Sequence, residues 1–225
     1  MISTWILYLI GPAILAMWAQ AKVMGAFRKY SQIRASSGLT GAETAREILD
    51  AAQIHDVEIV QINGMLGDHY DPTRKQLCLS AETYNSPSIA AEGVAAHETG
   101  HAIQHARAYA PLQWRMTVVP ATMFVSRILP FVIIGGLWFG MFGLLKIGVL
   151  CYAVMMVFQL ITLPVEFDAS RRAKIILGQL GIIQPGAEAA GVNAVLDSAA
   201  LTYVAAFIAA LGNFMYLLTM TQRRR

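Results

Sequence analysis

Four long stretches without a charged residue limit most strongly what this chain can fold into. They cover residues 1–21, 128–145, 147–165 and 198–222. Each approaches or exceeds the length of about 20 residues that an α-helix needs to cross about 30 Å of hydrocarbon. A mean hydropathy of +0.51 with only 14% charged residues agrees with this reading. The sequence therefore predicts a mainly α-helical membrane protein with about four transmembrane helices.

The charged residues are concentrated between Lys22 and Arg115, which indicates a single soluble insert in a membrane scaffold. We expect a first transmembrane helix over residues 1–24, the insert over 25–115, a membrane hairpin of two spans over 116–165, a cytoplasmic segment that begins with a helix over 166–198, and a last transmembrane helix with a basic tail over 199–225.

Hydrophobic periodicity predicts the elements of the insert. Residues 41–52 carry apolar side chains at helical spacing, which is typical of a short amphipathic helix. Residues 57–62 alternate and are rich in β-branched side chains, so they read as a strand, and residues 76–80 read as a second short strand. Turn signals lie between them, and we expect a small β-hairpin. The insert is thus predicted to be a small α+β domain.

Residues 88–108 predict one continuous helix that contains His97-Glu98-Thr99-Gly100-His101, an H-E-x-x-H sequence. Positions i and i+4 lie on one helix face, so the two imidazoles can bind one zinc ion. Glu98 is rotated by about 100° and can reach a metal-bound water without being a ligand. The competing interpretation is a pair of solvent-facing histidines. The apolar surroundings of the helix favour the metal site.

A catalytic zinc ion usually has three protein ligands, so a third ligand is needed. His105 lies eight residues from His97, about 12 Å along the helix, and the sequence offers no break that would bring it back. Glu166 is the better candidate, because a carboxylate beside so much apolar sequence needs a partner. The competing reading is an interfacial carboxylate paired with Arg171 or Arg172.

Asp168 lies two residues beyond Glu166 and has three open roles. It can cap the following helix, pair with Arg171 or Arg172, or orient a ligand histidine. Tyr84, Arg171 and Arg172 are weak candidates for an oxyanion donor, and the sequence does not choose among them.

Residues 95–104 and 163–173 together resemble the bacterial YugP-type family of neutral zinc metallopeptidases, which is itself similar to the HtpX-like membrane peptidases. The resemblance covers essentially the whole chain and implies a zincin-like insert. It implies His97, His101 and Glu166 as ligands of one zinc ion and Glu98 as the general base. HtpX-like enzymes have an aspartate four residues after the ligand glutamate. This chain has Ser170 there, and Asp168 is an alternative for the same contact.

We therefore expect a membrane-embedded zinc peptidase whose substrate is a peptide or protein, held as an added strand beside residues 76–80. The alternatives are a zinc hydrolase of a non-peptide amide and a non-catalytic scaffold that retains a zinc site. The net charge of +3 includes basic residues beside the spans, so we expect contact with the lipid bilayer and none with nucleic acid. No pattern indicates an oligomeric state. Cys78 and Cys151 lie in different segments and predict no disulfide.

The basic residues also predict orientation in a bacterial inner membrane. Lys22, Arg28, Lys29 and Arg34 follow the first span, which favours a cytoplasmic insert and a cytoplasmic active site. Four spans then leave Arg223–Arg225 on the outer side, against the same rule. We give more weight to the first span, because it usually dominates orientation.

Overall fold

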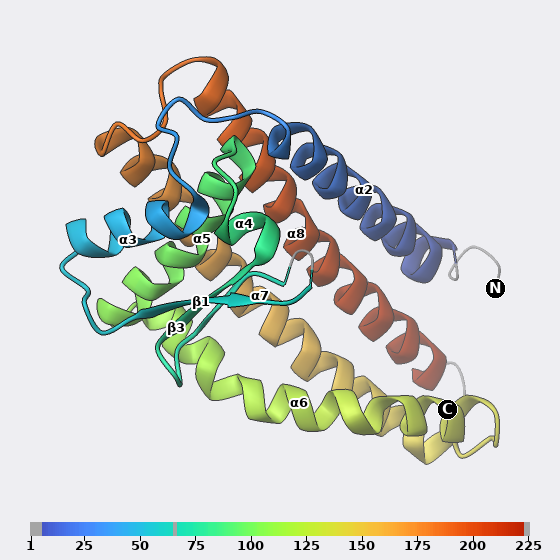
Figure 1. Ribbon diagram of the computed structural model, residues 1–225. Helices are drawn as coiled ribbons and strands as arrows, with labels where there is room; N and C mark the ends of the chain where they lie inside the picture. The colour runs from blue at the N-terminus through green and yellow to red at the C-terminus, as the bar shows by residue number, and fades with distance from the viewer. Residues whose placement is uncertain (1–5, 65–66, 223–225) are drawn as a thin grey trace. The chain divides into compact units, whose positions relative to one another are not determined.

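The computed structural model describes residues 6–64 and 67–222 (Figure 1). In chain order the elements are η1 (Ile6–Ile10), α2 (Gly11–Ser31), α3 (Gly41–Ala51), β1 (Glu58–Ile62), β2 (His69–Asp71), β3 (Gln76–Ser80), α4 (Ala81–Tyr84), α5 (Ile89–Ala106), α6 (Ala110–Leu137), α7 (Phe142–Gln179) and α8 (Ala187–Gln222). The first five residues of the expected first span and the basic tail Arg223–Arg225 lie outside the described residues.

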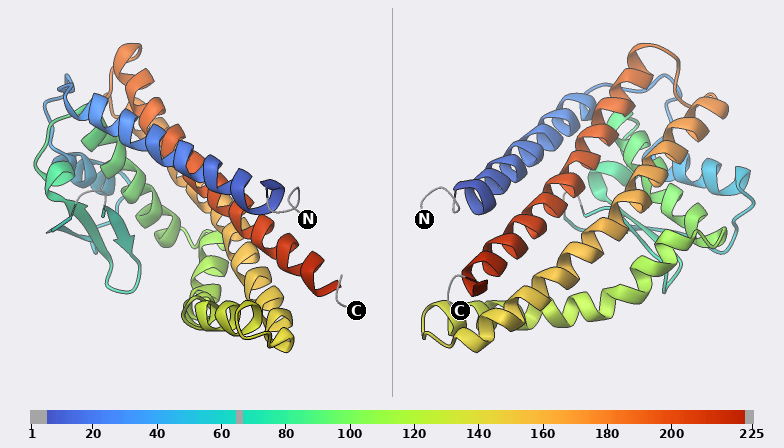
Figure 2. Two further views of the ribbon diagram at one scale, coloured as in Figure 1. Left: turned by 90° about the vertical axis from the view of Figure 1, so that its right-hand side faces the viewer. Right: turned by 180° about the vertical axis from the view of Figure 1, so that it is seen from behind.

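In the described part of the chain, four helical segments are long and apolar enough to cross a membrane. They are Ile6–Ser31, Ala110–Leu137, Phe142–Gln179 and Ala187–Gln222 (Figure 2). Together with the small sheet, they confirm the predicted fold class, a mainly α-helical membrane protein with a small α+β insert. The first segment runs continuously to Ser31, beyond the end predicted from the charges.

The chain divides into two compact units, and we describe each separately. The first, which we call the helical unit, comprises Met1–Gln20, Pro111–Pro164 and Leu201–Arg225. Its helices approach closely at small residues: a Cβ added to Gly212 would lie 2.3 Å from the Tyr8 carbonyl oxygen. Phe124 and Phe131 on α6 are exposed, as expected of side chains that face lipid.

The second unit, the insert unit, comprises Ala21–Ala110 and Val165–Ala200 and contains the sheet. The predicted hairpin is wrong in its pairing. β1 pairs in parallel with β3, and the antiparallel partner of β3 is β2, a three-residue strand that the sequence analysis missed. The strand order is β1-β3-β2, so β3 is central and has a neighbour on each side (Figure 1). Residues 76–78 therefore have a partner strand on both sides and no free edge for a substrate strand.

Side-chain caps fix where the two principal helices of the insert begin. Thr40 caps α3 in a complete capping box with Glu43, and Ser88 accepts from the Ala91 backbone N–H at the start of α5. Such caps typically stabilise a helix by about 1 kcal/mol. Ile48 and Leu49 of α3, Leu77 of β3 and other apolar residues form the core of the insert unit.

The C-terminal part of the chain is simpler than predicted. The sequence analysis separated a short helix over about 186–197 from the last span, but α8 is one helix. No proline interrupts it there, the helix runs through Gly191, and Ser198 does not cap a new helix, because its hydroxyl donates to the Val195 carbonyl oxygen at 2.8 Å. Similarly, α7 continues through Pro164 as one helix.

The packing of α5 on α7 within the insert unit depends on Gly100. A Cβ added at Gly100 would lie 2.8 Å from the Ala169 carbonyl oxygen and 3.2 Å from the Ala169 Cα. Both atoms belong to backbone and cannot rotate away. A residue without a side chain is therefore needed here for the two helices to approach this closely.

Replacement of Gly100 with alanine should destabilise the insert unit by about 1–3 kcal/mol, the usual cost of overpacking a close contact. Gly178→Ala on α7 is the matched control, because an added Cβ there has nothing within 4 Å. It should be neutral or stabilise by up to about 1 kcal/mol. Thermal unfolding of the purified variants in one detergent measures both. A wild-type melting temperature for Gly100→Ala would contradict the close approach.

Candidate metal centre

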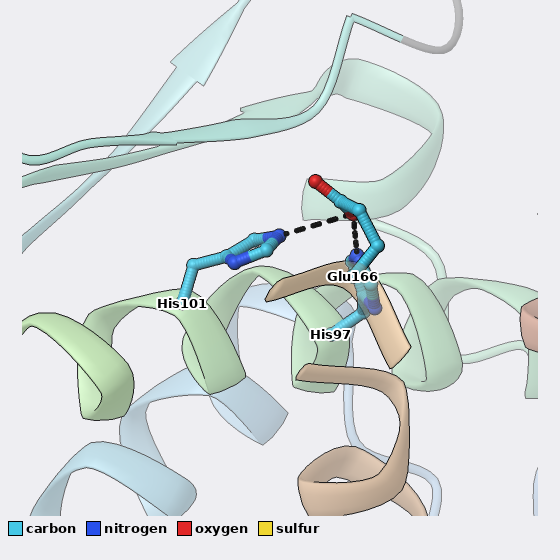
Figure 3. A group of neighbouring side chains, drawn as sticks. All are labelled: His97, His101 and Glu166. Atoms are coloured by element: carbon cyan, nitrogen blue, oxygen red, sulfur yellow. Dashed lines mark hydrogen bonds and ion pairs between the residues drawn. The ribbon is translucent and has the colours of Figure 1, made fainter. Parts of the chain in front are cut away.

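His97 and His101 lie one turn apart on α5 and point from the same face of the helix (Figure 3). Each residue is 8% exposed. The ring centroids are 4.8 Å apart and the rings are nearly perpendicular. The prediction that the H-E-x-x-H helix would turn both imidazoles into packed surroundings, rather than toward solvent, agrees with this burial.

Glu166 approaches the same point from α7. It is 1% exposed, and its Oε2 lies 3.2 Å from His97 Nε2 and 3.4 Å from His101 Nε2 (Figure 3). A buried carboxylate is costly unless it is paired or coordinates a metal. The structure therefore brings together the three residues that the sequence singled out as ligand candidates.

The spacing of these three residues fits a metal ion. One ligand atom from each residue can be chosen so that all three lie within 4.8 Å of one another. Two atoms about 2.0–2.1 Å from a tetrahedral zinc ion lie about 3.4 Å apart, which matches the separations between Glu166 Oε2 and the two imidazoles. Two imidazoles and a carboxylate are also a ligand set found in catalytic zinc sites.

The chain is similar to known proteins along nearly its whole length. Residues 5–222 match the family model described as "Putative neutral zinc metallopeptidase". A Bacillus subtilis (strain 168) protein named "Putative membrane protease YugP" is 48% identical over 197 residues, which are 88% of this chain and 87% of that protein. The chain belongs to the neutral zinc metallopeptidase family. No solved structure matches.

The polar side chains behind His101 fix which of its nitrogens faces Glu166 in this member of the zinc metallopeptidase family. Gln104 Nε2 donates to the Val165 carbonyl oxygen at 2.8 Å and to Asp168 Oδ2 at 3.0 Å. Because both of these partners are acceptors, the amide oxygen of Gln104 is the atom that faces His101 Nδ1, at 3.0 Å. His101 Nδ1 must then donate, which leaves the Nε2 lone pair directed at Glu166.

Ser170 holds the other imidazole. Its hydroxyl lies 3.1 Å from His97 Nδ1. The resemblance to HtpX-like enzymes left open whether Ser170 or Asp168 makes this contact, and the structure assigns it to Ser170. A serine hydroxyl can accept from Nδ1–H and thereby keep Nε2 free for a metal ion.

Among the residues that the structure describes, Asp168 reaches the histidines only through Gln104. It ion-pairs with Arg171 and, at 2.5 Å, with Arg172. Of its three predicted roles, pairing with the arginines is observed, and orientation of a ligand histidine is indirect. The sequence analysis missed Gln104. Its signal was a polar residue at position i+3 from His101, close to the face of the helix that carries the two histidines.

His105 does not join the ligand group. Its Nδ1 lies 2.9 Å from the Tyr70 hydroxyl on β2. Burial raises the pKa of Tyr70 to about 12, so this hydroxyl keeps its proton at neutral pH. The preference for Glu166 over His105 as the third candidate therefore agrees with the geometry.

The charges around the site oppose the effect of burial. Burial lowers the pKa of His101, but the hydrogen bond and the negative charge of Glu166 outweigh it and raise the pKa above the ordinary value. Glu98 is 9% exposed. Among the described residues its carboxylate has no hydrogen-bond or ion-pair partner.

Removal of the hydrogen bonds behind the histidines should weaken zinc binding without abolishing it. Ser170→Ala and Gln104→Met should each lower zinc affinity by about 10–100-fold, the usual effect of losing a group that orients a ligand. Chelator competition measures the affinity. The matched control is Ser198→Ala, since Ser198 is also buried but its hydroxyl donates to a carbonyl oxygen of its own helix. Equal affinities of Ser170→Ala and Ser198→Ala would contradict the role of Ser170.

Proposed function

We propose that the chain is an integral-membrane, zinc-dependent endopeptidase that uses Glu98 as its general base. The convergence of His97, His101 and Glu166, with the unpaired carboxylate of Glu98 on the same helix, carries this proposal. Family membership and the name of the Bacillus subtilis relative support it. A site that only held a metal ion would have no need for a free glutamate beside the first histidine.

The residues have distinct roles in the proposed reaction. His97, His101 and Glu166 would hold one zinc ion, with Ser170 and Gln104 keeping the imidazoles in orientation. When bound, zinc would lower the pKa of a coordinated water to about 7 and polarise the substrate carbonyl. Glu98 accepts the proton of the attacking water and later donates it to the leaving amine.

An extended peptide substrate would add to the free edge of β2. Residues 76–78 of the central strand β3 are paired on both sides, whereas β2 lies at the end of the sheet. β2 also contacts α5, through Tyr70 and His105. A peptide paired with β2 would be held by main-chain hydrogen bonds close to the helix that carries Glu98.

The purified protein should contain about one zinc ion per chain. Glu166→Ala should lose most of the zinc, because a catalytic zinc site usually has three protein ligands and only the two imidazoles would remain. Elemental analysis after dialysis measures the content, with Glu82→Ala, an exposed glutamate on α4, as the control. Full zinc content in Glu166→Ala would remove Glu166 from the ligand set.

Glu98→Gln should keep zinc and the fold but lose peptide hydrolysis by about 10²-fold or more, because an amide cannot take the proton of the attacking water. Glu47→Gln, an exposed change on α3, should keep the wild-type rate. A broad peptide-library screen of wild type, followed by rate measurements on one cleaved peptide, makes the comparison. A wild-type rate in Glu98→Gln would refute the general-base role, and cleavage of simple amides but of no peptide would refute the peptidase.

We also propose a multi-pass arrangement in a bacterial inner membrane with the metal centre on the cytoplasmic side. Lys22, Arg28 and Lys29 on α2 and Arg34 beyond it support this orientation. If α6 and α7 both cross the membrane, then α5 and the part of α7 that carries Glu166 face the same compartment. A metal ion shared by the two helices requires this.

A single cysteine at Lys75→Cys, on a background that lacks Cys78 and Cys151, should be shielded from a membrane-impermeant thiol reagent in intact cells. Lys75 suits the probe, because its side chain is 51% exposed. A cysteine added after Arg225 should be labelled. Labelling at position 75 would place the metal centre outside. Shielding at both positions would mean an odd number of crossings.

A further inference from the structure

A concave surface of the insert unit lies apart from the three ligand residues. Residues of helices α3, α5 and α7 line a groove that is open to solvent and has a volume of about 550 Å³. This volume is within the range of sites that bind small molecules. The residues that matter here are Ile48, Ile103, Ile176 and Leu180, which are apolar, and Arg107 and Arg172, which are cationic.

The groove separates charge from apolar surface along its length. Arg172, Ile176 and Leu180 occur at successive turns of α7 and just beyond its end, so about 12 Å separates the cation from the last apolar side chain. Arg107 follows the last residue of α5 and adds a second cation to the lining. The arrangement has a cationic part and an aliphatic floor.

The positive charge in this groove is not fully neutralised. Arg171 and Arg172 share one carboxylate, that of Asp168. Arg172 uses its Nε for that bond, which leaves the terminal nitrogens available to an incoming anion. Arg107 is exposed and has no ion pair in the part of the chain that the structure describes. Two arginines therefore line the groove, and the one carboxylate that pairs with Arg172 is shared with Arg171, which favours an anionic ligand.

We propose that this groove binds a free long-chain aliphatic carboxylate, with its head at Arg107 and Arg172 and its chain over Ile176 and Leu180. Arginine binds carboxylates through charge-assisted, often bidentate, hydrogen bonds. The aliphatic chain removes apolar surface of the groove from water. Neither a small anion nor an uncharged amphiphile satisfies both parts of the site.

Occupancy of the groove is coupled to the metal centre through Asp168, and this part of the proposal rests on the zinc site proposed above. Asp168 Oδ2 accepts from both Arg172 Nε and Gln104 Nε2, and Gln104 holds His101. A ligand carboxylate bound to Arg172 would compete with Asp168 for the positive charge of Arg172. It would also add a negative charge near the zinc ion. Both effects strengthen zinc binding, and the coupling is reciprocal.

Binding is tested with dodecanoate and zinc-free, full-length protein in nanodiscs of zwitterionic lipid, by isothermal titration calorimetry. Saturable binding of one dodecanoate is expected, with none by acetate or by dodecyl maltoside. Arg107→Gln and Ile176→Glu should each weaken binding by about 10-fold or more, whereas Arg74→Gln, an exposed arginine outside the groove, should not. Equal binding heats for the wild type and all variants, or for dodecanoate and dodecyl maltoside, would show that the ligand only partitions into the lipid. Either result would overturn the proposed site.

The coupling is tested by chelator competition for zinc with and without saturating dodecanoate. Zinc affinity should rise about 5-fold or more in the wild type, within the usual range of coupling between two sites, and stay unchanged in Arg107→Gln. Unchanged wild-type affinity with dodecanoate bound would overturn the coupling. Because dodecanoate binding is measured without zinc, a failure of the metal centre and a failure of the groove give different results.

Discussion

The contact of α5 with α7 at Gly100 is the constraint on which the site depends. Glu166 is buried, and its carboxylate can face two imidazoles only if the backbones of the two helices meet. Gly100 lies between the two histidines of α5, and Ala169 lies three residues after Glu166 on α7. Two short segments, one on α5 and one on α7, therefore contain both the glycine that permits the close approach and the three residues that meet because of it.

Hydrogen bonds behind the two histidines then fix the orientation of their imidazole rings. Ser170 and Gln104 engage the Nδ1 atoms of the two histidines, so both Nε2 atoms turn toward Glu166. Gln104 is itself held by Val165 and Asp168, which belong to α7. The polar residues of α7 thus supply a carboxylate to the centre and also position the imidazoles of α5. The structure explains why a serine can stand where HtpX-like enzymes have an aspartate.

Local sequence patterns predicted the parts of this protein that local interactions determine. The start of α5 follows from the Ser88 cap, and the long apolar helices follow from the absence of charge. Glu166 was found because a carboxylate beside a membrane span needs a partner. The parallel pairing of β1 with β3 was missed, because it depends on contacts across a crossover and not on a turn signal. Gln104 was missed because an uncharged amide shows its role only when Asp168 packs against it.

The coordination of the bound metal tests the account most directly. X-ray absorption at the zinc edge of the purified protein should show nitrogen and oxygen neighbours only, at about 2.0–2.2 Å, with the signature of two imidazoles. A sulfur neighbour at about 2.3 Å would contradict the account, because it would place Cys78 or Cys151 on the metal ion in place of the ligand set of His97, His101 and Glu166.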